Sequence, residues 1–178
     1  MNTYGYVGGN PIRKIDLFGL KDYLVVVGTG TGGFGPLAGE AGTIFIIDPC
    51  TFDIYTFLYL GGGGGIGFGG AVTLEGGVLS AGDPMDITGW GMQTGGFAAA
   101  GPGGAVSIPF GSNDAGDAYT GIAGGIAGGG GAGVSGMLTY TWHDNTYRFD
   151  NAPDFLKDIL EPIKPDCSCE PAKSLFDR

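Results

Sequence analysis

The sequence predicts a mainly β protein: a glycine-rich antiparallel meander that closes into a small barrel or sandwich and ends in a short C-terminal helix. Three observations support this prediction. Glycine supplies 40 of the 178 residues, yet 43% of the residues are hydrophobic and only 15% are charged. That balance is opposite to the one typical of disordered chains. Large apolar residues alternate with small ones, and turn-forming residues separate the alternating stretches.

The central stretch, residues 23–142, contains 36 of the 40 glycines and no lysine or arginine. The whole chain carries a net charge of −10. Proteins that bind nucleic acids gain most of their affinity from basic side chains that contact phosphates. We therefore expect no nucleic-acid partner and no nuclease activity.

The first twenty residues carry the motif Asn-x-Tyr-x-Tyr-x-x-x-Asn-Pro-x-x-x-x-Asp-x-x-Gly-Leu. It is formed by Asn2, Tyr4, Tyr6, Asn10, Pro11, Asp16, Gly19 and Leu20. This motif resembles the end of the Rhs/YD-repeat core of polymorphic toxins, which include type VI secretion effectors. In that family the motif closes a large β-shell, and the chain that follows it is a variable toxin domain.

The resemblance also implies a self-cleavage site. The family's shell cuts itself after Gly-Leu, using an aspartate of the motif and a second aspartate upstream. By resemblance, Asp16 is the catalytic residue and Leu20–Lys21 is the scissile bond. Leu17 stands where the family usually has proline, and the upstream aspartate has no counterpart, so we expect no self-cleavage by this chain. The expected parts are a core remnant (1–20), a glycine-rich β toxin domain (21–150), and a helix with a proline-rich tail (151–178).

The toxin domain begins with the apolar, β-branched run Tyr23–Val27, and further strands are expected at Thr43–Ile47 and Asp53–Leu60. The glycines after the first run formally match a dinucleotide-binding fingerprint, Gly28-x-Gly30-x-x-Gly33. That fingerprint requires a helix to follow, and Phe34-Gly35-Pro36 is a poor helix start. We expect no cofactor.

Three long uncharged windows follow, Ile54–Leu74, Ile87–Asn113 and Ala118–Trp142, of 21, 27 and 25 residues. Each contains a threonine near its start and a valine 14 to 18 residues later: Thr56 and Val72, Thr88 and Val106, Thr120 and Val134. This spacing predicts three related β-hairpins, each as long as two strands and a turn. The acidic residues lie between the windows.

Within the windows, one parity is large and apolar, and the other is glycine, alanine or a hydroxyl residue, as in Val106–Phe110. This period of two indicates strands. A helix over Gly121–Gly136 would include nine glycines, which disfavours it by roughly 9 kcal/mol relative to alanine. After the last strand, Asn151–Leu160 has the N-cap and apolar spacing of a short amphipathic helix.

Few residues carry recognisable chemistry. His143, the one histidine, lies beside Asp144 and could act as the general base of an enzyme. Neighbouring residues on a strand point to opposite faces, which disfavours this pair. The sequence has no second histidine, no Cys-x-x-Cys and no Gly-x-Ser-x-Gly, so we expect no metal site. Self-cleavage belongs to the Rhs core rather than to the toxin domain.

The uncharged windows fit the length of transmembrane hairpins, which need two strands of about 9–11 residues and a turn. We therefore expect an effector toxin that inserts into the target membrane, forms a pore with a glycine-lined lumen and acidic rims, and depolarises the cell. The alternatives are an enzymatic toxin acting on a small molecule or protein in the target cytoplasm, and a non-toxic soluble β-barrel that binds a partner. A soluble form must hide its large aromatic side chains inside: Phe57, Phe68, Trp90, Phe97 and Phe110.

The resemblance also defines the expected partners and location. A dedicated secretion system would deliver the domain to a neighbouring cell, where its target is the lipid of the inner membrane. The Rhs shell would enclose it before release. A cognate immunity protein would protect the producing cell.

Overall fold

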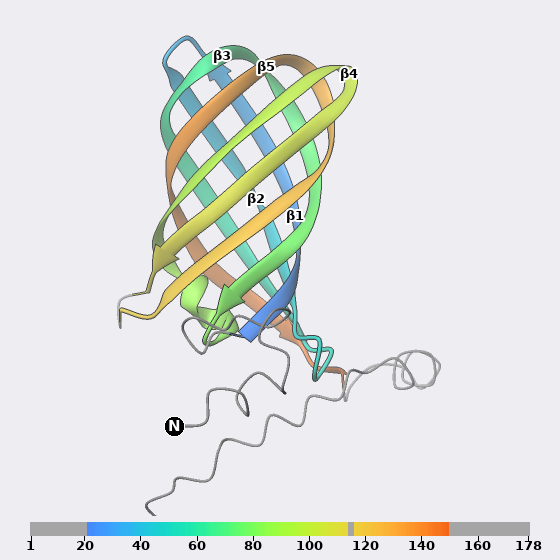
Figure 1. The fold of residues 1–178 in the computed structure, drawn as a ribbon, viewed down its shortest axis with the longest axis vertical. Helices are drawn as coiled ribbons and strands as arrows, with labels where there is room; N and C mark the ends of the chain where they lie inside the picture. Colours follow the sequence, from blue (N-terminus) through green and yellow to red (C-terminus); the bar gives the residue numbers. More distant parts are fainter. Residues whose placement is uncertain (1–20, 114–115, 150–178) are drawn as a thin grey trace, which may run out of the picture.

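In the computed structural model, which describes residues 21–113 and 116–149, the alternating stretches are strands (Figure 1). The strands are β1 (Lys21–Phe34), β2 (Leu37–Ile47), β3 (Ile54–Ala81), β4 (Gly89–Ser112) and β5 (Ala118–Tyr147), and a 3-10 turn, η1 (Pro84–Ile87), precedes β4. All strand pairings are antiparallel. The mainly β, antiparallel fold is therefore confirmed. The core remnant and the expected C-terminal helix lie outside the described residues.

Strand β3 doubles back on itself. Its residues 54–64 pair with β2, and its residues 68–81 pair with β1. Because β1 and β2 form an antiparallel hairpin, the two ends of β3 must lie at the same end of the molecule. The first uncharged window is thus one hairpin that encloses the β1–β2 hairpin.

Strands β5 and β4 double back in the same way. Strand β5 pairs with β3 along nearly its whole length, from Ile54↔Tyr147 to Ser80↔Thr120, and so follows its bend. Strand β4 pairs with both arms of β5. The two arms of β4 are also adjacent, since a Cβ placed on Gly95 would lie 2.7 Å from the carbonyl oxygen of Val106.

These pairings close a ring. Strands β1 and β2 contribute one span each and β3, β4 and β5 two each, which makes eight spans (Figure 1). Around the ring the order is β1, β2, first arm of β3, second arm of β5, first and second arms of β4, first arm of β5, second arm of β3. The hairpins are therefore nested: β3 pairs with β5, whereas a simple meander would pair it with β4. Closure leaves no unpaired sheet edge among the described strands.

The barrel has two different ends. We call the base the end that holds the first residues of β1, the last residues of β5, the connections 48–53 and 82–88, and residues 113, 116 and 117. We call the opposite end the tip. It lies at the top of Figure 1 and holds the β1–β2 turn and the bends of β3, β4 and β5.

Two facing glycines allow β3 and β5 to bend together at the tip. Gly69 pairs with Gly131, and both have positive φ angles, of 108° and 117°. A Cβ on Gly131 would lie 2.0 Å from the carbonyl oxygen of Phe68. Side chains are therefore excluded at this position both by backbone conformation and by the neighbouring strand.

We expect Gly131→Ala to destabilise the barrel by on the order of 2 kcal/mol, through strained backbone and overpacking. Gly130→Ala is the matched control, because a Cβ at Gly130 meets nothing within 4 Å. Urea unfolding followed by far-UV circular dichroism measures both. Equal stability of the two variants would contradict the tight bend.

Candidate functional site

The outward face of the barrel is apolar on every strand. Large apolar side chains are exposed along β1 and β2 (Leu24, Phe34, Leu37, Phe45), β3 (Leu60, Ile66, Phe68, Val72, Leu74, Val78), β4 (Trp90, Met92, Val106, Ile108, Phe110) and β5 (Ile122, Ile126, Val134, Leu138, Tyr140, Trp142, Tyr147). The most exposed are Phe34 at 86% and Ile66 at 83%. Soluble monomers rarely expose contiguous apolar patches larger than a few hundred Å².

This sidedness answers the question that the alternation alone left open. Along most of each strand the large parity faces outward and the glycine, alanine and hydroxyl parity faces inward, while near the base large residues such as Tyr23, Phe57 and Tyr59 also face inward. Of the five aromatic residues that a soluble form was expected to bury, Phe57 is buried and Phe97 is half-buried, whereas Phe68, Trp90 and Phe110 are exposed. The expectation that all five lie inside is therefore wrong for the described barrel.

An aromatic group lies on the outward face near the base. The Trp90 and Tyr140 rings meet edge to face at 5.1 Å between centroids, and the Trp142 ring stacks on Tyr140 at 6.3 Å. Tyr147, the last residue of β5, is also exposed. Trp and Tyr are the residues that membrane proteins place at the boundary between lipid and water.

The base also gathers the charged residues. Lys21, the first residue of β1, forms an ion pair with Asp48 at 2.5 Å. The Asp83 side chain caps η1, and Asp86 accepts hydrogen bonds from the Asp83 amide and from the Asn113 side chain. The Lys21–Asp48 pair joins β1 to the 48–53 connection, and the Asn113–Asp86 bond joins the end of β4 to the 82–88 connection.

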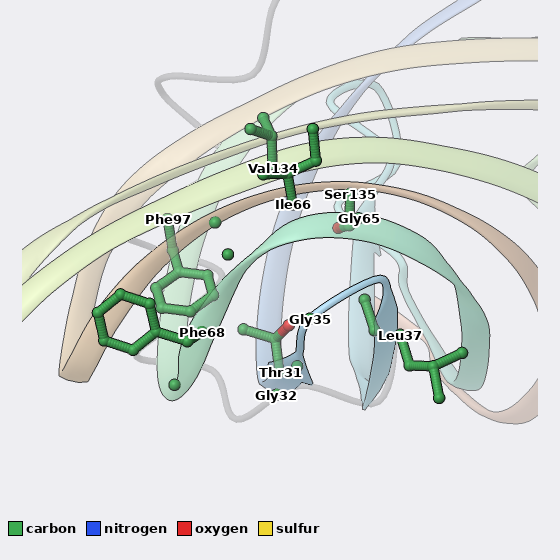
Figure 2. Close-up of a pocket in the computed structure, with 15 residues that line it drawn as sticks. Thr31, Gly32, Gly35, Leu37, Gly65, Ile66, Phe68, Phe97, Val134 and Ser135 are labelled. Atoms are coloured by element: carbon green, nitrogen blue, oxygen red, sulfur yellow. The ribbon is translucent and has the colours of Figure 1, made fainter.

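The tip is uncharged. Its outward surface is made of Phe34, Leu37, Ile66, Phe68 and Val134. Figure 2 shows Phe68, Phe97, Thr31 and Ser135 around a hollow beneath the bend of β3, with a volume of about 30 Å³.

The interior near the base is filled by apolar and aromatic side chains. Ten buried residues form this cluster: Tyr23, Val25, Val27, Ile46, Phe57, Tyr59, Leu79, Ala81, Ile87 and Tyr119. The phenol of Tyr59 is hydrogen-bonded to the Thr29 hydroxyl. Tyr59 thus joins the apolar cluster to the polar layer above it.

A buried polar layer crosses the middle of the barrel. It contains Thr29, Glu40, Thr73, Glu75, Ser107 and Thr139, each at most 6% exposed. Small residues make room for the two glutamates: a Cβ on Gly61 would lie 3.0 Å from Glu40 Cγ, and one on Gly125 would lie 2.7 Å from Glu75 Cα. Each of the five strands contributes at least one polar side chain to this layer.

A second cavity of about 30 Å³ adjoins the polar layer on its base side. Tyr59, Gln93, Ser107, Tyr119 and Thr139 supply its polar lining. Each of the two cavities has room for about two water molecules. In the described barrel, buried side chains occupy much of the interior where the sequence analysis expected an open, glycine-lined lumen.

The residues implied by the Rhs resemblance lie at the edge of the described chain. Asp16 and Leu20 fall outside the described residues. Lys21, expected to follow the scissile bond, is the first residue of β1 and is held by Asp48.

The candidate enzymatic pair lies on β5 at the base. The His143 ring is hydrogen-bonded to the Thr146 hydroxyl at 2.9 Å and meets the Phe57 ring edge to face. Asp144 is the extra residue where the β3–β5 register shifts, since Phe57 pairs with His143 and Thr56 with Asn145. The histidine ring is therefore oriented by Thr146, and no contact in the described chain links it to Asp144.

Glu40 and Glu75 are acidic residues whose position the sequence analysis did not predict. They were expected among the acidic rims between windows, whereas both lie inside the barrel on β2 and β3. The signal was present for Glu75, which shares the parity of Ala71 and Thr73 rather than that of Val72 and Leu74. The parity of Glu75 within its strand, rather than its position next to an uncharged window, predicts that its side chain faces the barrel interior.

Lys21 influences the titration of Asp48. Burial of the Asp48 carboxylate would raise its pKa, but hydrogen bonds from Lys21 and from the Cys50 and Thr51 amides, with the charge of Lys21, hold the pKa below its usual value. A carboxylate whose pKa is lowered on folding stabilises the protein fully above its unfolded pKa of about 3.9, and this contribution disappears as pH falls through the folded pKa.

We therefore expect Lys21→Met to raise the pKa of Asp48 and to move acid unfolding to higher pH, while Lys21→Arg leaves both nearly unchanged. Carbon-13 NMR titration of the Asp48 carboxyl measures the first effect, and circular dichroism against pH the second. An unchanged Asp48 pKa in Lys21→Met would show that the ion pair has no influence.

Among residues 21–113 and 116–149, no helix combines the length and the hydropathy needed to span a bilayer, and no group of three or more His, Cys, Asp or Glu side chains could hold a metal ion. No protein-family model, curated protein sequence or solved structure matches this chain.

Proposed function

We propose that this chain inserts into a lipid bilayer as a β-barrel and acts as the toxin domain of an Rhs-type antibacterial effector that depolarises the inner membrane of a target cell. The observation that carries the proposal is the sidedness of the barrel, apolar outside and polar in its middle layer. A protein that folds in water has the opposite arrangement. A closed barrel also satisfies its backbone hydrogen bonds internally, as a bilayer requires.

The dimensions of the strands support insertion. β2 has 11 residues and β1 has 14. At about 3.3 Å per residue and a tilt of about 40°, such spans rise roughly 28–35 Å. The hydrocarbon core of a bilayer is about 30 Å thick.

The contrast between the two ends supports one orientation. The base carries Lys21, Asp22, Asp48, Asp83 and Asp86 together with the aromatic group, whereas the tip carries no charge. Moving charged side chains through hydrocarbon is costly. In this proposal the tip enters the bilayer first, and the base stays at the surface from which the protein arrived.

The biological setting rests on the resemblance of residues 2–20 to the Rhs core motif. An Rhs shell would release the domain into a neighbouring cell through a type VI-type system, and an immunity protein would bind it in the producer. Depolarisation then accounts for toxicity without a catalytic site.

The test uses liposomes that hold a potassium diffusion potential, with an oxonol dye as reporter. We expect the purified full-length chain to float with the vesicles in a density gradient and to collapse the potential at micromolar concentration. A chain that stays in the aqueous fraction, or floats without depolarising the vesicles, would refute the proposal.

Leu74→Lys tests the lipid-facing surface. Leu74 is exposed near the middle of its span, where a lysine facing lipid costs about 2–4 kcal/mol. Leu24→Lys is the matched control, because Leu24 is exposed close to the base, where the cost is about 0–1 kcal/mol. We expect flotation and depolarisation to fall strongly in Leu74→Lys and little in Leu24→Lys. Equal behaviour would argue against a lipid-facing Leu74.

Expression in a susceptible cell, directed to the cytoplasm or to the periplasm, tests toxicity and the side of entry. We expect membrane potential to fall before growth stops. The double variant His143→Ala/Asp144→Ala should remain toxic, because the proposed action does not use these side chains. Loss of toxicity in a stably folded double variant would favour an enzyme.

A further inference from the structure

The two acidic residues inside the barrel have no basic partner. Glu40 is 6% exposed and Glu75 is 5% exposed. No lysine or arginine occurs between residues 22 and 147. Burying an unpaired carboxylate is so unfavourable that such groups normally pair with a cation or take up a proton. The interior pair must therefore obtain positive charge from outside the strands.

Hydrogen bonding distinguishes the two carboxyl groups. Glu75 Oε1 accepts a hydrogen bond from the Thr73 hydroxyl at 2.8 Å, and Oε2 accepts one from the Ser107 hydroxyl at 2.6 Å. Two donors suit an ionised carboxylate. Glu40 Oε2 accepts one bond from Gln93 Nε2 at 3.2 Å, and Glu40 Oε1 has no partner. Glu40 Oε1 is thus the oxygen suited to carry a proton.

The strand register places the two glutamates on either side of β1. Glu40 pairs with Thr31, and Glu75 pairs with Val27. Thr29 lies between these two β1 positions and is bonded to Tyr59. In the described chain, Tyr59 and Glu75 are the titratable groups that face Glu40. The β1, β4 and β5 neighbours contribute only hydroxyl, amide and glycine groups.

Two small, mainly apolar spaces, each with a few polar side chains in its lining, lie on either side of the pair. Thr31 and Ser135 line the hollow at the tip, and Gln93, Ser107 and Thr139 line the cavity toward the base. Each space measures about 30 Å³, which suits about two water molecules and is too small for a hydrated metal ion. These small spaces favour the passage of protons, which can move from one oxygen atom to the next without a hydration shell.

We infer that Glu40 and Glu75 share one proton, held on Glu40 Oε1, and that the inserted barrel passes protons through this pair rather than hydrated ions. This inference rests on the proposed membrane function. In each cycle the O–H bond of Glu40 breaks as a new O–H bond forms on an oxygen toward the base. The Glu40 carboxylate then takes a proton from the tip side, so the pair returns to one negative charge.

The experiment compares proton and potassium fluxes in liposomes. For protons, vesicles loaded with pyranine are given a negative interior potential by valinomycin, and acidification is followed. For potassium, vesicles loaded with KCl and treated with a protonophore are placed in NaCl, and efflux is followed with an electrode. We expect the full-length chain to admit protons while potassium efflux stays at the protein-free rate.

Substitutions locate the pathway. Glu40→Gln keeps the shape of the side chain but cannot exchange its proton, so we expect proton entry to slow about a hundredfold. Glu40→Asp keeps a carboxyl group and should retain much of the wild-type flux. Asp22→Asn is the matched control, because it removes an exposed carboxylate at the base and should conduct normally. Flotation and circular dichroism confirm that each variant is inserted and folded.

The outcomes separate this inference from the proposed function. A wild-type chain that floats and depolarises vesicles, but passes potassium as readily as protons, overturns the inference and leaves the proposed function standing. Equal proton flux in the wild type and in Glu40→Gln also overturns the inference. So does a loss of proton flux that is as large in Glu40→Asp as in Glu40→Gln. If the wild-type chain neither floats nor depolarises, the proposed function itself fails.

Discussion

The pairing of β3 with β5 is the interaction on which the rest of the structure depends. These two strands remain in antiparallel register through their shared bend, so each arm of one lies beside an arm of the other. The ring can then include the β1–β2 hairpin on one side and the β4 hairpin on the other. Facing glycines at the bend make this continuous pairing possible, because a side chain on either strand would collide with the backbone of its neighbour.

Closure of the ring gives each strand one face toward the interior and one toward the surroundings. The interior of a barrel with eight spans is narrow. Inward positions are therefore occupied by small residues wherever a large side chain from another strand fills the space. The outward parity is free to be large, and in this chain it is apolar. In the proposed function this apolar face lies in hydrocarbon, and the charges at the base set the direction of insertion that we propose.

The polar layer is the feature that apolar packing does not explain. A barrel interior of this width could be filled with leucine and valine, as it is near the base, at no electrostatic cost. Instead two carboxyl groups lie within one layer, where Glu75 accepts hydrogen bonds from the Thr73 and Ser107 hydroxyls and Glu40 accepts one from the Gln93 amide. No lysine or arginine occurs between residues 22 and 147, and in our inference the uptake of one proton lowers the charge of the pair. The fold brings Glu40 and Glu75 into one buried layer, and these are the residues whose charge the interior must accommodate.

By itself, the sequence determined the strands and their two parities, because side chains alternate at a period of two whatever the partner. It also determined the three hairpins, and the absence of Lys and Arg from residues 23–142 is the basis for expecting no nucleic-acid partner. Only the tertiary structure decided which parity faces outward, and hence that Phe68 and Trp90 are exposed while Phe57 is buried. It also decided that Glu40 and Glu75 share one layer. Periodicity is local, whereas closure depends on pairings between residues as much as 93 positions apart, such as Ile54 and Tyr147.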